Sequence, residues 1–344
     1  MKMKKKGLLL CLVLLLVVSM VAVGCGKKAD PPPVDTTDPK ANWPSNLALG
    51  TAAPGGVYFV YGGWASLVEE IVGIPTSVEA TGGPADNMML VHDGELQLGM
   101  ITMGIGFDGW TGAKGTAFEN DPHTNVRALF PMYSTYSHWW AHKDTGIKGL
   151  SDLEGKVVGV GPTGGTPGTY HPLILKLLGI NADVVWGGTA DQVESQIDGM
   201  IQANSQATGL PMGGLIQYYS TVGADNVVLF GPNAEERKKI LAAYPYWTES
   251  VIPKATYDVL SEDLTTINVF NWAIAHKDLP ENLVYEIVDA IMTNNDRMLQ
   301  IHKAAAETLP TAIGTNTFLP LHPGAYKWFI DNGYKVPDGA KPID

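Results

Sequence analysis

One pattern recurs along the chain from Asn46: a short apolar, β-prone run, a glycine-rich turn, and then a stretch with helical spacing. Such strand–loop–helix repeats predict parallel sheets covered by helices. The predicted strands span residues 46–51, 76–81, 96–102, 156–161, 184–188 and 226–231, and the first helix is expected over 57–72. Because the pattern restarts near Lys156, we expect an α/β fold with two lobes.

Two segments depart from this repeat. Residues 126–142 are aromatic, β-prone and without helical periodicity, and residues 267–276 form a comparable late run followed by an amphipathic helix. Both are predicted to be extended strands that cross between the lobes. Two such crossings make a hinge, which allows two lobes to close around a ligand. We expect lobe one to comprise residues 45–138 and 268–344, and lobe two residues 139–267.

The N-terminus has the features of an export signal. Four lysines precede an apolar run of 16 residues, Leu8 to Val23, which is shorter than the roughly 20 residues that a membrane-spanning helix needs. Residues 1–24 are therefore predicted to be a signal peptide. Ala22 to Cys25 resembles a bacterial lipobox, with Ala22 where a larger apolar residue is usual, and predicts lipidation of Cys25. Ordinary secretory cleavage or an uncleaved anchor is the alternative.

Residues 25–44 contain three consecutive prolines and few residues to bury, so we expect a lipid-anchored tether. The predicted location is the cell envelope, in the periplasm or at the outer face of the cytoplasmic membrane. The other cysteine, Cys11, lies in the signal peptide, so the mature chain has no pair for a disulfide.

Charge excludes nucleic acid as a partner. The 344 residues include 23 Lys and Arg against 35 Asp and Glu, a net charge of -12. Removal of the signal peptide takes away four lysines and no acid, which leaves 19 basic residues and a charge of -16. A phosphate backbone is bound by basic surfaces, and this chain offers the opposite.

Ligands of open α/β sheets bind beyond the carboxyl ends of the strands. That rule selects three loops, residues 51–58, 81–87 and 162–169, each with a hydroxyl and paired glycines before a helix start. A carboxylate or phosphate can approach bare backbone N–H groups there, with the helix dipole behind them. Alternatively, the threonines cap the helices and the glycines only turn the chain.

Signatures of catalysis and of cofactor or metal binding are missing. The chain has no Walker motif, nucleophile elbow or zinc-protease motif, and no G-x-G-x-x-G in a strand-to-helix setting. His138 and His142 are four residues apart, but the tryptophans between them favour a strand, where the two side chains lie about 13 Å apart. We therefore expect no metal and no cofactor.

Five segments together resemble the TAXI-type solute receptors of TRAP transporters, a branch of the periplasmic binding proteins. They are residues 49–63, 79–102, 147–169, 209–211 and 320–333. The resemblance implies a two-lobed α/β periplasmic-binding-protein fold with two crossing strands as hinge and the site in the cleft. It also implies a receptor that hands a small organic acid to a membrane permease driven by an ion gradient.

Matching the family motifs position by position gives the candidate ligand-binding residues. They are Thr51, Gly55, Gly56, Tyr58, Thr81, Gly82, Gly83, Asn87, Thr102, Met103, Thr163, Gly164, Gly165 and Thr166. The chain departs from the family where Met103 replaces a polar residue and where Gly164 and Gly165 precede Thr166 without a serine.

The ligand is expected to carry one carboxylate. The three loops contain neither Lys nor Arg, so backbone N–H groups and the hydroxyls of Thr51, Tyr58, Thr81 and Thr166 would hold it. A second carboxylate would need a cation, and the nearest, Arg127 and Lys143, lie outside the motifs. Candidates for an apolar wall are Met103, Tyr133, Tyr136, Trp139 and Trp186, and for each of them ordinary core packing is the alternative.

Two other functions fit the same fold. An enzyme would need a general acid or base in the cleft, where the loops offer hydroxyls, an amide and Asp86, which suits the first turn of a helix equally well. A receptor for an ATP-driven importer has the same binding chemistry, and a neighbouring gene for a fused permease would separate the two.

Overall fold

A computed structural model describes residues 39–343. The chain divides after Ala41, and the fold described below is that of the unit from Asn42 onward. The predicted signal peptide, most of the predicted tether and Cys25 lie outside the described residues.

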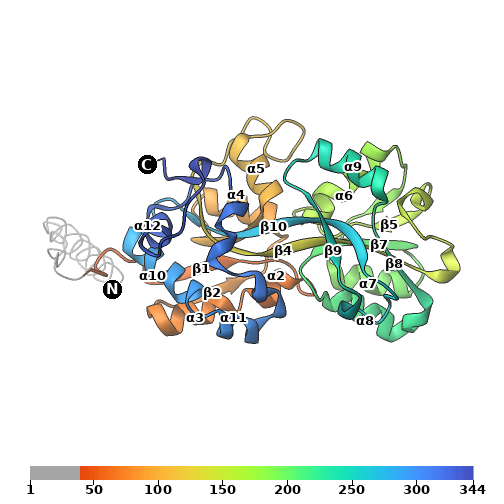
Figure 1. Cartoon of the computed structure of the whole chain (residues 1–344), viewed down its shortest axis with the longest axis horizontal. Helices are drawn as coiled ribbons and strands as arrows, with labels where there is room; N and C mark the ends of the chain where they lie inside the picture. The colour runs from red at the N-terminus through yellow and green to blue at the C-terminus, as the bar shows by residue number, and fades with distance from the viewer. Residues whose placement is uncertain (1–38, 344) are drawn as a thin grey trace, which may run out of the picture. The chain divides into compact units, whose positions relative to one another are not determined.

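A ten-stranded sheet runs through two halves of this unit, which lie at the left and right of Figure 1. The first half begins with β1 (Leu47–Gly50), α2 (Val57–Tyr61), α3 (Trp64–Leu67), β2 (Thr76–Glu79), α4 (Pro84–His92), β3 (Leu98–Thr102) and α5 (Met103–Thr111). Strand β1 pairs in parallel with both β2 and β3. This is the predicted strand–loop–helix arrangement.

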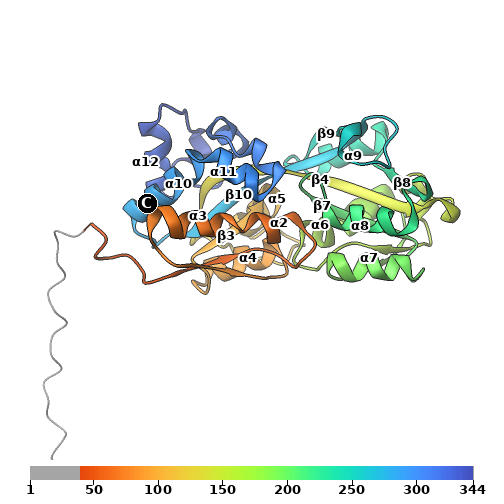
Figure 2. The same ribbon diagram turned by 90° about the horizontal axis from the view of Figure 1, so that it is seen from below.

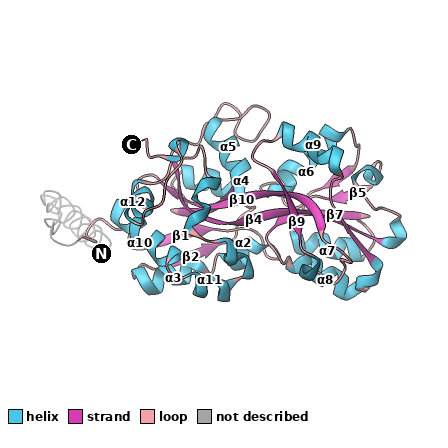
Figure 3. Cartoon of the chain, viewed as in Figure 1, coloured by secondary structure: helices cyan, strands magenta, loops and turns pink. Residues whose placement is uncertain are grey.

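The second half repeats the arrangement. Its elements are β5 (Val157–Gly159), α6 (Thr166–Leu178), β6 (Asp183–Val185), α7 (Thr189–Ile197), β7 (Ala203–Thr208), α8 (Gly213–Val222), β8 (Val227–Phe230), α9 (Ala234–Ala243) and β9 (Thr248–Ile252). Strand β5 lies between β6 and β7 and is parallel to both. Figure 3 shows helices on both sides of the strands in each half.

Two long antiparallel strands join the halves, β4 (Val126–His142) and β10 (Leu264–His276). One end of β10 pairs with β3 and the other with β9, whereas β4 pairs with β7 and β8 at its far end. Figure 2 shows both strands passing from one half into the other. The prediction of two lobes with two crossing strands is confirmed, and the predicted boundary residues of the lobes stay a prediction.

After β10 the chain returns to the first half. It forms α10 (Glu281–Met292), α11 (Asn295–Ile301) and α12 (Pro323–Asp331). Helix α12 packs against α10 and β4, which places the C-terminal segment on the first half.

The helix expected over residues 57–72 is broken. The structure has two short α-helices, α2 and α3, followed by a π-helical turn at Val68–Val72, and the break falls at Gly62 and Gly63. A Cβ on Gly62 would lie 2.5 Å from the Thr51 methyl group, and one on Gly63 would lie 3.1 Å from Ile301. The glycines therefore let the chain pass close to β1 and α11, at the cost of helix continuity.

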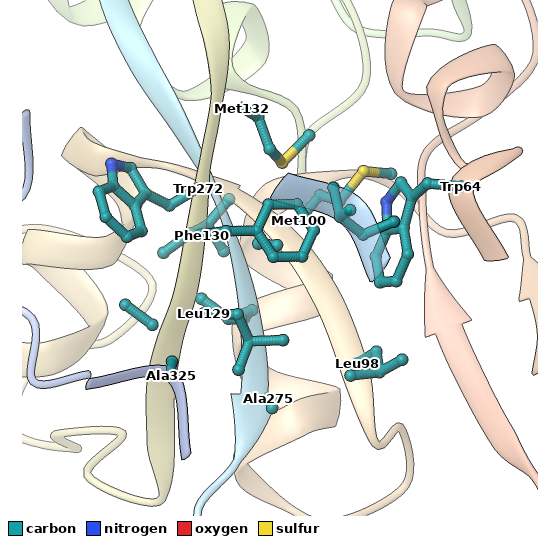
Figure 4. Close-up of a cluster of buried hydrophobic side chains, with 14 of the residues drawn as sticks. Trp64, Leu98, Met100, Leu129, Phe130, Met132, Trp272, Ala275 and Ala325 are labelled. Carbon is teal, nitrogen blue, oxygen red and sulfur yellow. The ribbon is translucent and has the colours of Figure 1, made fainter. Parts of the chain in front are cut away.

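Large side chains from both crossing strands fill the core of the first half. Figure 4 shows Phe130 of β4 beside Trp64 of α3, with Met132 and Trp272 nearby. The Phe130 and Trp64 rings meet edge to face at 5.5 Å. The crossing strands are therefore held in the core of the first half, and their other ends carry the strands of the second half.

Among residues 39–343, no helix combines the length and the apolar character needed to cross a membrane.

Candidate functional site

A cavity of about 60 Å³ lies where the two halves meet. The lining residues are Ala52, Ala53, Gly56, Val57, Tyr58, Gly82, Gly83, Pro84, Thr102, Thr135, Pro162, Gly165, Thr166, Pro167, Thr189, Gln206, Ala207, Thr208 and Met212. They come from the carboxyl ends of β1, β2 and β3 in the first half and of β5, β6 and β7 in the second, and from the loops and helix starts that follow these strands, with Thr135 from β4. This is the carboxyl-end position that open α/β sheets use for ligands.

Six helices begin at this cavity: α2, α4, α5, α6, α7 and α8. The residues before their first turns are Gly56, Gly83, Thr102, Gly165, Gly188 and Met212, and none of these gives a side-chain hydrogen bond to its helix. Backbone N–H groups at helix starts carry partial positive charge. The arrangement therefore favours a negatively charged group in the cavity.

No formal charge balances or adds to these dipoles. None of the described residues that line the cavity is Lys, Arg, Asp, Glu or His. Burial raises the pKa of the Tyr58 hydroxyl well above its usual value, so this group stays neutral and donates to Asn271 Oδ1 at 2.6 Å. The polar groups that the described lining offers a ligand are therefore hydroxyls, an amide and backbone.

Seven of the predicted site residues line the cavity: Gly56, Tyr58, Gly82, Gly83, Thr102, Gly165 and Thr166. The hydroxyls of Thr102 and Thr166 share a hydrogen bond of 3.1 Å between the halves. Both side chains are buried. A ligand that bonds to either hydroxyl would therefore replace the bond between them, and not a bond to water.

Three other predicted residues serve the scaffold. The Thr51 hydroxyl donates to Glu79 O at 2.8 Å, and the Thr81 hydroxyl donates to Asn87 Oδ1 at 2.8 Å. The Asn87 amide donates to Thr51 O and Met100 O, both at 2.8 Å. These bonds tie the loops of β1 and β2 to β3, and none of the three side chains reaches the cavity. Thr51, Thr81 and Asn87 thus do not line the cavity in this structure, and their contact with a ligand stays a prediction.

The last four predicted residues lie beside the cavity without lining it. Gly164 O accepts from Ala85 N at 3.0 Å, a backbone bond between the halves, and Gly55 has φ +94° and faces Thr189. Met103 lines a groove on the other side of α5, and Thr163 lines a separate cavity beyond Gly164. Gly55, Met103, Thr163 and Gly164 therefore lie around the cavity without contributing to its described lining.

Sequence reasoning missed the contribution of the second half beyond its first loop. Thr189 begins α7, and Gln206 and Thr208 end β7, so the carboxyl-end rule applied to these two strands would have found them. The Thr208 hydroxyl accepts from Val57 N at 3.2 Å, and Thr189 donates to Gln206 Oε1 at 3.4 Å. No motif marks Thr135, which reaches the site from the crossing strand β4.

None of the five candidates for an apolar wall is among the described residues that line the cavity. The apolar part of the lining comes from Val57, Met212 and the small residues and prolines of the loops. Tyr133 and Trp139 are fully buried in the cores of the halves, and Trp186 is 46% exposed and donates to Gly168 O. Arg127 donates to the carbonyls of Thr124 and Val126. Like Met103 and Tyr136, these side chains are not part of the cavity.

His138, considered above as a metal ligand, lies on β4 with both ring nitrogens occupied. They bond to Tyr136 O at 2.8 Å and to the Tyr257 hydroxyl at 2.9 Å. Within residues 39–343, no group of three or more His, Cys, Asp or Glu side chains is placed to hold a metal ion.

Known proteins share this architecture. MatC from Rhodopseudomonas palustris with bound malate matches at a TM-score of 0.53 with 12% identity, over 83% of this chain and 95% of that one. PhnD1 from Prochlorococcus marinus MIT 9301 in complex with methylphosphonate matches at 0.51 with 12% identity, over 77% of this chain and 91% of that one. At these identities the likeness establishes the fold, that of the type II periplasmic binding proteins.

The sequence itself matches one family model, described as the NMT1-like family, over residues 49–333. This range includes every strand beyond the first two residues of β1 and the whole cavity lining. The relationship inferred from the five sequence segments is confirmed at this level. The chain belongs to the NMT1-like family and is a solute-binding protein with the type II periplasmic-binding-protein fold.

Proposed function

We propose that the chain is an extracytoplasmic receptor that captures a small organic carboxylate in this cavity and delivers it to a TRAP-type permease. The observation that supports the proposal most directly is the meeting of six helix starts, none capped by the side chain of the residue before it, around a cavity whose described lining carries no charge. Such a site stabilises an anion through backbone dipoles and hydroxyls, without a counter-charge.

Cavity size limits the ligand. A cavity needs about 10–15 Å³ to hold one water molecule, so the 60 Å³ of this cavity holds about four to six groups of that size. A short organic acid is of this size, and a nucleotide is far too large. The helix starts and hydroxyls of the loops would surround its carboxylate, and Val57, Met212 and the loop prolines would contact its carbon chain.

The charge of the lining favours a monocarboxylate. One carboxylate can be compensated by helix starts and hydroxyls, but a second would be buried without a cationic partner. An uncompensated buried charge costs several kcal/mol. The malate bound by MatC is a dicarboxylate, so a preference for monocarboxylates would set this chain apart from that structural relative.

Capture would proceed by closure of the halves on the two crossing strands. Residues from both halves line the cavity, and closure removes water from their hydrogen-bonding groups. Hydrogen bonds and charge–dipole attraction are stronger once water is excluded. Opening at the permease would reverse these gains and release the ligand.

A thermal-shift screen of the purified chain against small mono- and dicarboxylates, phosphonates, amino acids and sugars tests the proposal. A ligand at 100 times its dissociation constant adds about 2.7 kcal/mol to stability, which raises the melting temperature measurably. Stabilisation by short organic acids is expected. Stabilisation by sugars alone would contradict the proposed ligand class.

Delivery needs its own test. Reconstituted permease in vesicles should accumulate the identified acid only when this chain and an ion gradient are both present. ATP-dependent accumulation, or a neighbouring gene for an ATPase rather than a fused permease, would favour the ATP-driven importer instead.

Lipidation of Cys25 would hold this acidic protein at the membrane. A single acyl chain gives only marginal anchoring, so the several chains of a bacterial lipoprotein are what the proposal requires. Replacing Cys25→Ser should move the protein from the membrane fraction to the soluble fraction of lysed cells. Retention of the variant at the membrane would rule out anchoring through this residue.

A further inference from the structure

A further polar contact joins the halves outside the cavity. The Tyr170 hydroxyl on α6 donates to Asp108 Oδ2 on α5 at 2.6 Å. Asp108 is 5% exposed and Tyr170 is 1% exposed, and neither residue lines the cavity assigned to the solute. We infer that the hydrogen bond between Asp108 and Tyr170 controls closure of the halves and is a pH-sensitive determinant of solute affinity that does not touch the solute. The inference concerns closure and does not depend on which solute binds.

Tyr170 is held in place from its own half. Its ring lies 5.6 Å from that of Tyr246, 5.9 Å from that of Tyr244 and 5.9 Å from that of Trp247, all in the segment between α9 and β9. A side chain packed among three rings has few alternative positions. The hydroxyl is therefore a fixed donor that Asp108 reaches only when the halves are together.

The first half offers space for the Tyr170 side chain at Gly104. Gly104 lies one turn before Asp108 on α5, and a Cβ there would be 2.8 Å from the Tyr170 hydroxyl and 2.7 Å from the Tyr246 ring. The absence of a side chain at Gly104 lets the two helices approach each other. The contact is thus built into both halves rather than resulting from one long side chain.

Asp108 has few charged neighbours. Beside it is a cavity of about 300 Å³ in which Asp86 is the one other charged residue of the described lining, and the hydroxyls of Tyr170, Tyr244 and Tyr246 complete the titratable groups around it. Burial raises the pKa of Asp108 to about 6, and the Tyr170 bond offsets part of that rise. Burial of the ionised carboxylate therefore raises the free energy of the closed state relative to the open state.

The direction of the pH effect follows. Opening would return the carboxyl to water and its pKa toward 3.8, so the closed state binds a proton more tightly than the open state. Closure is most favourable when Asp108 is protonated in both states. It becomes less favourable as the pH rises from about 4 to about 6, and levels off above that range.

Distances between spin labels on the two halves measure closure directly and need no ligand. Lys114 and Lys238 are exposed, one in each half, and their replacement by Cys in a chain with Cys11→Ser and Cys25→Ser gives two unique labels. At pH 7.5, Tyr170→Phe should lower the ratio of closed to open molecules by about tenfold, because a buried carboxylate loses its donor.

Three further variants separate control of closure from a general loss of structure. Asp108→Asn keeps the acceptor without the charge, so closure should become independent of pH between 4.5 and 7. The double variant Tyr170→Phe with Asp108→Asn should recover most of the closure lost in Tyr170→Phe, since no buried charge then lacks a donor. Tyr244→Phe removes a hydroxyl from the same aromatic cluster and should leave the distances unchanged.

The inference is overturned if Tyr170→Phe and Asp108→Asn both leave the distances and their pH dependence as in the parent chain. It is equally overturned if Tyr244→Phe opens the halves as much as Tyr170→Phe does. A chain that binds no carboxylate but shows these distance changes would refute the proposed ligand class and support the control of closure.

Discussion

Hydroxyl groups around the site have two kinds of partner. Those of Thr102 and Thr166 bond to each other across the two halves, at the wall of the cavity. Those of Thr51 and Thr81 bond within the first half, to Glu79 O and to Asn87. The hydroxyls of Thr102 and Thr166 can rearrange around a ligand. Those of Thr51 and Thr81 hold in place the loops that border the cavity.

Replacing Thr166→Val should therefore weaken ligand binding more than it weakens the fold. The variant loses one hydroxyl at the cavity, for which we expect about tenfold lower affinity. Titration calorimetry with the best ligand from the screen measures this, and urea unfolding should show a smaller loss of free energy than in Thr81→Val, because one hydroxyl rather than two backbone and side-chain groups loses its partner. Unchanged affinity would mean that Thr166 does not contact the ligand.

Replacing Thr81→Val should instead lower the stability of the fold more than the affinity for the ligand, and it is the matched control for Thr166→Val. It leaves Asn87 Oδ1 and Gly83 N without the partner they have now, which costs about 1–3 kcal/mol of stability. The affinity measured on the remaining folded protein should change less than in Thr166→Val.

The sequence predicted the loops of the site better than the roles of single residues. The carboxyl-end rule located Gly56, Gly83 and Thr166 correctly at the cavity. It placed Thr51 and Thr81 there as well, because a hydroxyl before a glycine-rich turn looks alike whether it faces a ligand or a neighbouring strand. Which of the two occurs depends on side-chain direction, which the local sequence does not record.

At the scale of elements, the site depends on contact between two glycine-rich loops, one before α4 and one before α6. Ala85 N donates to Gly164 O at 3.0 Å, and a Cβ on Gly164 would lie 2.3 Å from Asp86 Oδ1 and 3.3 Å from the Gly82 carbonyl carbon. The halves can approach this closely because these positions carry no side chain.

Gly164→Ala should hinder closure while leaving each half folded. Asp86 would have to leave the Gly82 N–H that it now accepts from at 2.9 Å, so we expect at least about tenfold weaker ligand binding from the lost hydrogen bond. Gly149→Ala, where a Cβ meets open space, is the control and should bind normally. Equal affinities in the two variants would show that loop contact does not limit closure.

Two buried histidines should make the second half sensitive to acid. Burial lowers the pKa of His138 to about 4 and that of His171 to about 3, while both return toward 6.5 on unfolding. The unfolded chain thus binds more protons, and stability present above pH 6.5 is lost as the pH falls. Between pH 7 and 5 the loss is about 2 kcal/mol for each histidine.

Hydrogen exchange at pH 7 and pH 5 would locate this loss. After correction for the intrinsic exchange rates, protection should fall at pH 5 in β5 and β7, which pack around His171. Asp108 acts in the opposite direction over the same range, because its pKa is raised, but it lies between the halves. Equal protection of β7 at both pH values would contradict the prediction.

Hydrophobic patterning predicted the elements where the pattern was long. The run from Val126 to His142 is one strand with these bounds, because 17 consecutive residues without helical spacing can be buried on both faces of a sheet. The helix expected over residues 57–72 breaks at Gly62 and Gly63, since tertiary contact with Thr51 and Ile301 outweighs its local periodicity.

At the scale of the whole molecule, the two lobes and their crossing strands could be predicted, whereas the cavity could not. Its volume and lining depend on how closely the lobes approach each other, and residues far apart in sequence, such as Tyr58 and Met212, meet only then. The contribution of Thr135 from β4 likewise arises from the hinge passing behind the site.

Both lobes contribute to the surroundings of the ligand, so the charge that a ligand can carry depends on the whole molecule. None of the described lining residues is Lys or Arg, and Arg127, the cation considered for a second carboxylate, bonds instead to Thr124 O and Val126 O. Titration calorimetry should show tighter binding of short monocarboxylates than of succinate, malate, glutamate or 2-oxoglutarate. A second carboxylate left without a cation costs several kcal/mol, so the difference in affinity should exceed about a hundredfold. Tighter binding of the dicarboxylates would show that the closed complex recruits a cation, and a crystal structure of that complex would then have to place one beside the ligand.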